Sequence, residues 1–277
     1  MGFDAARYWE KRLARLTNLE GVGCEGRSVT WNRILYRTKI RALNRVLKRL
    51  QYSLSGQAAL DIGCGVGFWI DTLHHMGAAS LTGVDIATSA IAHCQERFKD
   101  MDNASFRHGD FGGEDFSTDE WTERFNLVTS FDVFYHITDE DHFQTAIANV
   151  ARVMAPGARF LVSDIFGRET LRPQEHVVFR SREAYRLALE ANGLEVEHVE
   201  PVTVFLNSPV DARGLYSTFM NLLYYKITNK LTRKPGSDGL LQRLWLGGLY
   251  HTETPLLAVC PSLGQTNRLL VARKPPG

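Results

Sequence analysis

Three glycines at alternate positions, directly after an apolar segment, form the most informative motif of the chain. Residues 58–62 read Ala-Ala-Leu-Asp-Ile, then Gly63, Gly65 and Gly67 follow, and Phe68 begins a second apolar stretch. Closely spaced glycines allow a turn too tight for side chains, and the first N–H groups of a helix after it attract polar ligand groups. The pattern predicts a buried strand, a ligand-binding turn and a helix. The dinucleotide-binding fingerprint needs a glycine at position 68, so Phe68 argues against a nicotinamide-dependent dehydrogenase.

Polar side chains stand beside this turn and at the ends of the next predicted strands. Asp61 directly precedes the glycines, where its carboxylate can accept from an ammonium group or organise the turn. Asp85 ends the second strand, a position from which a carboxylate can bind ribose hydroxyls. Asp110 and Phe111 end the third strand and offer an acceptor for an exocyclic amine and an aromatic face for a purine. Singly, Asp85 could cap a helix and Asp110 a loop, but their joint placement favours a nucleoside ligand.

Strand-like and helix-like segments alternate from residue 57 onward, which is typical of an α/β fold with a parallel sheet covered by helices on both faces. The expected strands are 58–62, 80–86, 105–110, 125–131, 158–166, 194–205 and 267–274. The expected helices between them are 67–77, 88–101, 139–154 and 181–192. Thr138 and Ser181 are the predicted N-caps of the last two helices. Ligands of such sheets bind beyond the carboxyl ends of the strands, where the polar residues above lie.

In their order and spacing, the segments ALDIGCGVGF, LTGVDI, HGDF and FNLVTSFDVFYHI resemble the successive motifs of class I S-adenosylmethionine-dependent methyltransferases. The resemblance covers residues 57–205 and returns at 267–274. It implies a seven-stranded Rossmann-like sheet whose last strand is antiparallel, S-adenosyl-L-methionine as cofactor and S-adenosyl-L-homocysteine as product. The cofactor-binding residues that it implies are Asp61, Gly63, Cys64, Gly65, Gly67, Asp85, Ile86, Gly109, Asp110, Phe111, Ser130 and Phe131.

The same resemblance assigns parts of the cofactor to these residues. Asp61 and the glycines would hold the methionine end, Asp85 the ribose, and Asp110 with Phe111 the adenine. The backbone of Ser130 and Phe131 would line the sulfonium. Cys64 is interpreted as a small packing residue of the turn rather than a nucleophile.

We expect three regions along the chain. Residues 1–55 form an N-terminal helical lid or substrate segment, residues 56–205 plus 267–274 form the cofactor-binding core, and 206–266 form a helical insertion between the last two strands. The insertion is apolar and aromatic at helical spacing, so it could be a substrate cap, a homodimer interface or a membrane-surface patch. In the N-terminal segment, Trp9 and Tyr36, with Tyr8 and Arg33, could cover the cofactor or simply pack as helix residues.

Composition excludes several classes of protein. The 277 residues contain 44% hydrophobic and 23% charged residues, as an ordinary globular chain does. They contain neither a long apolar run nor the apolar core of a signal peptide, so we expect no transmembrane segment and a cytoplasmic location. The four cysteines are dispersed, which favours free thiols over a zinc site or disulfides.

Charge is distributed unevenly, although the net charge is only +1. Residues 1–50 have a balance of +8 and residues 51–150 a balance of −12. The acidic middle disfavours a nucleic-acid partner. The basic N-terminal segment is either a solvated helix face or an attraction for a phosphate-bearing substrate or an anionic membrane surface.

The predicted activity is methyl transfer to a small organic acceptor, with the hydroxyl of a sugar-bearing, lipid-like or other specialised metabolite favoured. His136, just beyond the fourth strand, is the candidate general base, although a histidine here could serve only to shape the pocket. Asp132 and Asp164 could share a metal ion, but Ile165 follows Asp164 where the metal-dependent relatives have an Asp-Asn pair, so we expect none. The alternatives are N- or C-methylation, and a cofactor-binding scaffold without turnover.

Overall fold

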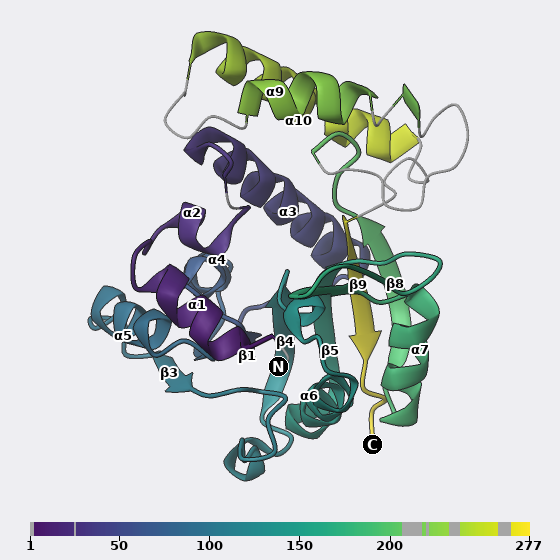
Figure 1. Ribbon diagram of the computed structural model, residues 1–277. Helices are drawn as coiled ribbons and strands as arrows, with labels where there is room; N and C mark the ends of the chain where they lie inside the picture. The colour runs from purple at the N-terminus through teal and green to yellow at the C-terminus, as the bar shows by residue number, and fades with distance from the viewer. Residues whose placement is uncertain (1–2, 25, 207–217, 220–221, 233–238, 260–266) are drawn as a thin grey trace.

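A seven-stranded sheet forms the centre of the protein. The computed structural model describes residues 3–24, 26–206, 218–219, 222–232, 239–259 and 267–277 (Figure 1). The strands of the sheet are β1 (Ala58–Ile62), β2 (Ser80–Asp85), β3 (Ala104–His108), β4 (Phe125–Phe131), β5 (Met154–Ile165), β8 (Glu195–Pro201) and β9 (Asn267–Arg273). Their order is β3-β2-β1-β4-β5-β9-β8, with β1 to β5 parallel and β9 antiparallel to both of its neighbours. The predicted fold class is therefore confirmed.

Strand bounds follow the predictions closely, and the differences have local causes. β1 and β4 have the predicted bounds. β5 begins four residues earlier than expected because Met154 already pairs with Phe125, ahead of a register shift. β8 ends at Pro201. Just beyond it, the N–H groups of Val204 and Phe205 donate to the buried carboxylate of Glu253 and not to another strand.

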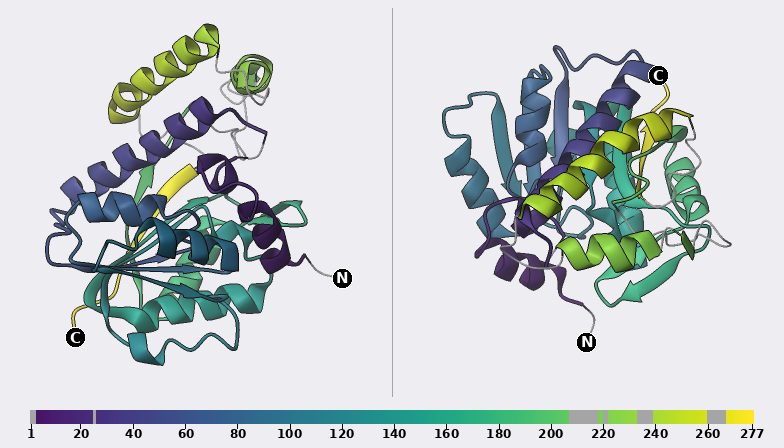
Figure 2. Two further views of the ribbon diagram at one scale, coloured as in Figure 1. Left: turned by 90° about the vertical axis from the view of Figure 1, so that its left-hand side faces the viewer. Right: turned by 90° about the horizontal axis from the view of Figure 1, so that it is seen from above.

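Helices cover both faces of the sheet and bury two separate apolar clusters. One face carries α3 (Val29–Arg49), α4 (Phe68–His75) and α5 (Thr88–Arg97), and the other carries α6 (Glu140–Val153) and α7 (Arg182–Ala191). Both layers are visible in Figures 1 and 2. The central strands β1 and β4 are thereby buried on both faces.

The helix caps confirm one prediction and correct another. Ser181 caps α7 by accepting from the N–H of Ala184. Thr138 was expected to cap α6, but the cap is Asp139, whose Oδ1 accepts from the N–H of His142 at 3.0 Å. A carboxylate is the stronger acceptor at the positive end of a helix, and Asp139 has the extended backbone that a cap requires.

Additional short elements lie outside the sheet and the helices that cover it. At the N-terminus lie α1 (Ala5–Leu13) and α2 (Leu19–Val22), and an unpredicted hairpin of β6 (Leu171–Gln174) and β7 (Val177–Phe179) follows β5. Two short 3₁₀ turns, η1 (Asp119–Trp121) and η2 (Phe134–His136), flank β4.

The described part of 206–266 forms the π-helix η3 (Leu222–Thr228), α9 (Asn229–Thr232) and α10 (Leu240–Val259). α10 lies over α3 on the side away from the sheet, as Figure 2 shows, and its Leu246 and Tyr250 pack with Trp31 and Leu35 of α3. Phe219 and several leucines of α10 remain exposed, whereas the side chains of Tyr224 and Tyr225 lie outside the described residues. In the part of the chain that the structure describes, the helices are too short or too polar to cross a membrane.

Candidate active site

The glycine turn follows β1 as predicted, and its backbone could not be formed with larger residues. Gly63 and Gly65 have φ values of +73° and +51°. A Cβ at Gly63 would lie 2.3 Å from the side chain of Val133, and one at Gly65 would lie 2.5 Å from Val22. Both the left-handed backbone and the close neighbours therefore require glycine. The turn is fixed by the carbonyl of Val84, which accepts from the N–H groups of Gly63 and Cys64 at 2.7 and 2.9 Å.

Asp85 ties the glycine turn to the end of β2. Its carboxylate is buried and accepts from the N–H of Gly65 at 2.8 Å and from the N–H of Ala87 at 2.9 Å. Burial raises the pKa of Asp85, although these backbone hydrogen bonds oppose that effect. Ala87 is the N-cap residue of α5, so Asp85 does not cap that helix. Asp85 instead lines a cavity.

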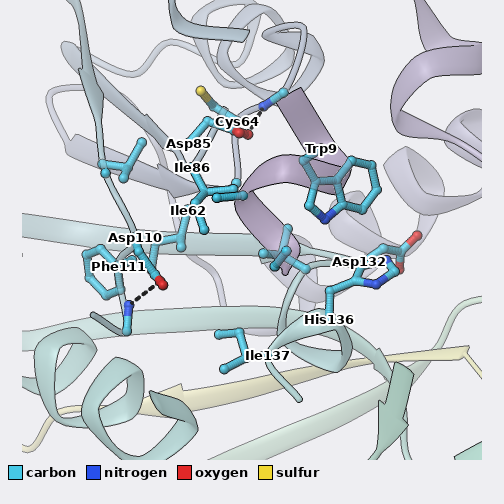
Figure 3. Close-up of a pocket in the computed structure, with 18 of the residues that line it drawn as sticks. Trp9, Ile62, Cys64, Asp85, Ile86, Asp110, Phe111, Asp132, His136 and Ile137 are labelled. Carbon is cyan, nitrogen blue, oxygen red and sulfur yellow. Dashed lines mark hydrogen bonds between the residues drawn. The ribbon is translucent and has the colours of Figure 1, made fainter. Parts of the chain in front are cut away.

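That cavity, about 690 Å³ in volume, lies over the carboxyl ends of the strands and is called the first cavity below. Figure 3 shows Asp85, Ile86, Asp110 and Phe111 on one side of it and Trp9, Asp132 and His136 on the other. The predicted cofactor residues that line it are Gly63, Cys64, Gly65, Asp85, Ile86, Gly109, Asp110, Phe111 and Phe131. The structure thus brings residues from four strand ends to one cavity.

Three predicted residues are absent from its described lining. Ser130 is fully buried and its hydroxyl donates to the carbonyl of Ile62. Gly67 is the N-cap residue of α4, packed against Phe98 and Cys94. Asp61 is buried in β1, directly before the turn. Its Oδ1 accepts from the hydroxyl of Thr129 at 2.8 Å, while its buried Oδ2 has no partner among the described residues. Burial raises the pKa of Asp61 to about 7.

The first cavity is acidic. Its described lining contains seven carboxylates and neither Lys nor Arg. The carboxylates are those of Asp4, Asp85, Asp110, Glu114, Asp132, Asp139 and Asp141. Such a wall attracts a cationic ligand.

The sequence left open whether the N-terminal helix covers the cofactor or only packs against other helices. In the structure, residues of this helix line the first cavity. Trp9 and Leu13 of α1 line the first cavity, and Tyr36 of α3 joins them. Tyr8 lines a neighbouring cavity, and Arg33 is exposed. The amphipathic pattern of residues 5–13 was the available signal, but it does not indicate which surface the apolar face covers.

His136 lines the first cavity. Its Nδ1 is 2.9 Å from the carbonyl oxygen of His176, which can only accept, so Nδ1 carries the proton and Nε2 keeps a lone pair. The ring packs edge-on against Trp9, with ring centres 4.9 Å apart. Burial lowers the pKa of His136 to about 4, so the ring is neutral at physiological pH.

A second cavity of about 580 Å³ adjoins the first. Both are lined by Trp9, Val22, Asp132 and His136, which form the junction between them. The second cavity is enclosed by α1, α3, η2 and the β6–β7 hairpin, and it contains polar groups that sequence reasoning did not single out for a site. These are Arg12, Cys24, Lys39, Tyr135, Gln174 and His176.

Asp132 anchors the junction. It has a left-handed backbone with φ +61°, and its Oδ1 accepts from the hydroxyl of Ser163 at 2.6 Å and the amide of Asn267 at 3.2 Å. Its Oδ2 forms an ion pair with Lys39, whose side chain is 2% exposed. Burial raises the pKa of Asp132, but the Lys39 ammonium outweighs burial and the pKa falls below its ordinary value. The pair therefore stays ionised.

Residues 59–157 match the family model of the methyltransferase domain. This core belongs to the class I S-adenosylmethionine-dependent methyltransferases. The mitochondrial ubiquinone biosynthesis O-methyltransferase of Dictyostelium discoideum is 29% identical over 119 residues, which are 40% of this chain and 36% of the relative. The chain spans about a third to a half of the length of the first curated relatives it matches.

Solved methyltransferase structures share the fold at low sequence identity. A chain of the complex between the Haloferax volcanii Trm112 methyltransferase activator and a methyltransferase has a TM-score of 0.57, with 19% identity and coverage of 99% of this chain and 100% of that chain. Phosphoethanolamine N-methyltransferase 2 of Haemonchus contortus, solved with phosphomonomethylethanolamine and S-adenosylhomocysteine, has a TM-score of 0.52. Its identity is 18%, over 86% of this chain and 52% of that one.

The cofactor of this methyltransferase domain is S-adenosylmethionine, and the described residues fit it. The sulfonium and ammonium groups are cations, which the seven carboxylates of the first cavity complement. The glycine turn leaves space where a Cβ would stand, and the unpartnered Oδ2 of Asp61 next to it suits an ammonium. These features agree with the predicted cofactor.

Proposed function

We propose that the protein transfers a methyl group from S-adenosylmethionine to a hydroxyl group of a small organic molecule, with His136 as general base. The observation that carries the proposal is the junction. A cavity suited to the cofactor and a second cavity with polar walls share His136 and Asp132 in their linings. Cavities of this size hold small molecules, and the second one, at about 580 Å³, supports a small acceptor over a macromolecule.

The division of labour follows from the placement of the residues. When bound, the cofactor would supply an electrophilic methyl carbon, which the acceptor oxygen would attack in line while the carbon–sulfur bond breaks and S-adenosylhomocysteine leaves. The walls of the two cavities align acceptor and methyl, and alignment of this kind is worth roughly 7–11 kcal/mol. Asp85 would hold the ribose hydroxyls, and Asp110 and Phe111 would hold the adenine.

Nε2 of His136 would accept the hydroxyl proton. Its lone pair is available because Nδ1 is bound to the His176 carbonyl. With a pKa of about 4 the ring is unprotonated and ready, but it is a weak base. It can therefore take the proton only as attack on the methyl group makes the hydroxyl more acidic.

Incubation of the protein with methyl-labelled cofactor and a fractionated metabolite extract tests the activity. We expect a labelled small product, and a His136→Gln variant should lose roughly 10²–10⁴-fold in turnover with its cofactor affinity within about twofold. His75→Gln is the matched control, because His75 is exposed at the end of α4 and belongs to the described lining of neither cavity. Undiminished turnover in His136→Gln would show that His136 only shapes the pocket.

The alternative functions predict different results. A cofactor-binding scaffold would bind S-adenosylmethionine and yield no labelled product from any fraction. N- or C-methylation would yield product whose label is stable to ether cleavage. A metal-assisted reaction would stop when a chelator is added, but the two candidate metal ligands, Asp132 and Asp164, are already engaged by protein groups. Asp132 is engaged by Lys39, Ser163 and Asn267, and Asp164 accepts from Tyr185 and Ile165.

A further inference from the structure

The second cavity contains a positive charge that the proposed mechanism does not use. Its described lining includes two basic side chains, Arg12 and Lys39, and one acidic side chain, Asp132. Lys39 and Asp132 are paired with each other. Arg12 forms no ion pair with any residue that the structure describes, so no described carboxylate compensates its guanidinium charge.

Arg12 is held in place by neutral groups. Its Nη2 donates to the carbonyl oxygens of Gly23 and Glu20 at 2.6 and 3.1 Å, and its Nη1 donates to the hydroxyl of Tyr8 at 3.2 Å. Its Nε is buried and has no hydrogen-bond partner in the described part of the chain. These contacts fix the direction of the side chain without neutralising it. A fixed, partly buried guanidinium is a favourable site for a carboxylate or phosphate group.

A second donor lines the same cavity. Burial raises the pKa of the Tyr135 hydroxyl well above its ordinary value, so the group keeps its proton. The structure gives it no hydrogen-bond acceptor among the described residues. Tyr135 adjoins His136 in η2 and lines the second cavity.

We propose that the second cavity binds the methyl acceptor by an anionic group, a carboxylate or a phosphate, set against Arg12, while a hydroxyl of the same molecule reaches His136. The inference rests on the proposed function and adds the substrate class. The anionic group is retained in the product, because methylation occurs on the hydroxyl. A neutral acceptor would leave the guanidinium without a counter-charge in a partly desolvated site, and that would cost affinity.

The charge of the cavity can be measured without knowing the acceptor, because Cys24 lines it and is exposed, whereas Cys64 and Cys94 are buried. The probes are anionic iodoacetate and neutral iodoacetamide, and peptide mass spectrometry measures the alkylation rate at Cys24. We expect the iodoacetate-to-iodoacetamide rate ratio to exceed that of 2-mercaptoethanol at least about fivefold, and the excess to shrink at high salt. A ratio equal to that of the free thiol would overturn the proposal.

Variants assign the effect to Arg12. Arg12→Gln should remove most of the excess, Arg12→Lys should keep much of it, and Arg15→Gln should keep all of it, because Arg15 is exposed and lies outside the lining. Since Arg12→Gln could loosen α1, protection experiments on the unaltered protein provide an independent measure. Inorganic phosphate or glucuronate should slow alkylation of Cys24, and glucose should not. Equal protection by glucose, or an excess that survives in a folded Arg12→Gln variant, would refute the role of Arg12.

The class of the acceptor is read from the labelled product of the extract experiment. We expect that product to be retained on an anion-exchange column. If phosphatase treatment abolishes this retention, the anionic group is a phosphate. If carbodiimide-coupled amidation abolishes it, the group is a carboxylate. A product that is not retained would overturn the inference and leave the methyltransferase function standing. If cofactor binds and no product forms at all, the proposed function fails, and the alkylation ratio still decides whether the cavity selects anions.

Discussion

The two cavities that meet at His136 are similar in size and opposite in charge. The first, at about 690 Å³, is lined by seven carboxylates and, among the described residues, by neither Lys nor Arg. The second, at about 580 Å³, has in its described lining one carboxylate, already paired with Lys39, and the additional charge of Arg12. The contrast matches the two proposed reactants, because a sulfonium is a cation and the proposed acceptor has an anionic group. Each wall therefore favours one partner and disfavours the other.

The difference arises from two parts of the sequence. The acidic wall comes mainly from the segment 51–150, with its balance of −12, and both basic residues come from 1–50, with its balance of +8. The uneven charge is visible in the sequence, but two interpretations of the basic segment were open: a solvated helix face or a site that attracts an anion. Arg33, Arg37 and Arg49 are exposed, as in a solvated face, whereas Arg12 and Lys39 line the second cavity.

The largest effect should come from breaking the buried ion pair at the junction. Lys39→Met leaves the Asp132 carboxylate ionised without a counter-charge. The loss of one partner of a buried ion pair lowers the free energy of unfolding by roughly 3–5 kcal/mol. Asp110→Asn in the wall of the first cavity should cost about 1 kcal/mol or less, because Asp110 is half-exposed and its carboxylate accepts, within the described part of the chain, only from the N–H of Gly112. Denaturant unfolding at neutral pH measures both values.

A second substitution distinguishes the charge from the packing of Lys39. Lys39→Met combined with Asp132→Asn removes the uncompensated charge, and it should recover part of the loss. If the double variant is no more stable than Lys39→Met alone, the methylene stem of Lys39 and not its charge stabilises the junction.

The next largest effect concerns pH and belongs to the first cavity alone. Asp61 has a raised pKa of about 7, so in the cofactor-free protein it is increasingly protonated as pH falls below 7. If its Oδ2 receives the cofactor ammonium, binding must release that proton. Affinity for S-adenosylmethionine should then weaken about tenfold for each pH unit below 7. Calorimetric titration between pH 5.5 and 7, in two buffers of different ionisation enthalpy, measures both the affinity and the proton release.

Asp61→Asn is the control for this prediction. Its affinity should be lower at pH 7 and nearly independent of pH. His136 and Asp132 at the junction should not contribute to this curve, because the pKa of His136 is about 4 and that of Asp132 is lowered, so neither changes charge over this range. A pH dependence that persists in Asp61→Asn would assign it to another carboxylate of the acidic wall.

The core could be predicted from the sequence because local pattern and global fold agree there. The apolar runs at 58–62 and 125–131 became β1 and β4 without change, since a strand buried on both faces has little choice of conformation. The prediction failed where a longer-range partner decided the outcome. Glu253 of α10 takes the backbone N–H groups beyond Pro201, and no signal near residue 201 indicates it.

The first cavity was largely predictable and the second was not. Residues of the first follow successive strand ends, so topology alone brings Asp85 and Asp110 together. The second draws Arg12 from α1, Lys39 from α3 and His176 from an unpredicted hairpin. A lysine beside the apolar face of 33–50 was the single local signal, because a buried lysine requires a partner.

The smallest effects test whether the two cavities are mechanically independent. Gly65 lines the first cavity and Gly26 the second, and both have positive φ, +51° and +73°. In Gly26→Ala the new Cβ meets nothing within 4 Å, so only the backbone strain remains, about 1–2 kcal/mol. In Gly65→Ala the Cβ would also lie 2.5 Å from Val22, which belongs to the junction of both cavities.

We therefore expect Gly26→Ala to lower stability slightly and to leave cofactor affinity unchanged. Gly65→Ala should weaken S-adenosylmethionine binding about tenfold, because either the turn or Val22 must move. It should also change the alkylation rate of Cys24 in the second cavity, since Val22 borders that cavity as well. Thermal unfolding, cofactor titration and the Cys24 rate measure the three quantities. If Gly65→Ala alters cofactor binding and leaves the Cys24 rate unchanged, the junction is rigid and the cavities select their ligands separately.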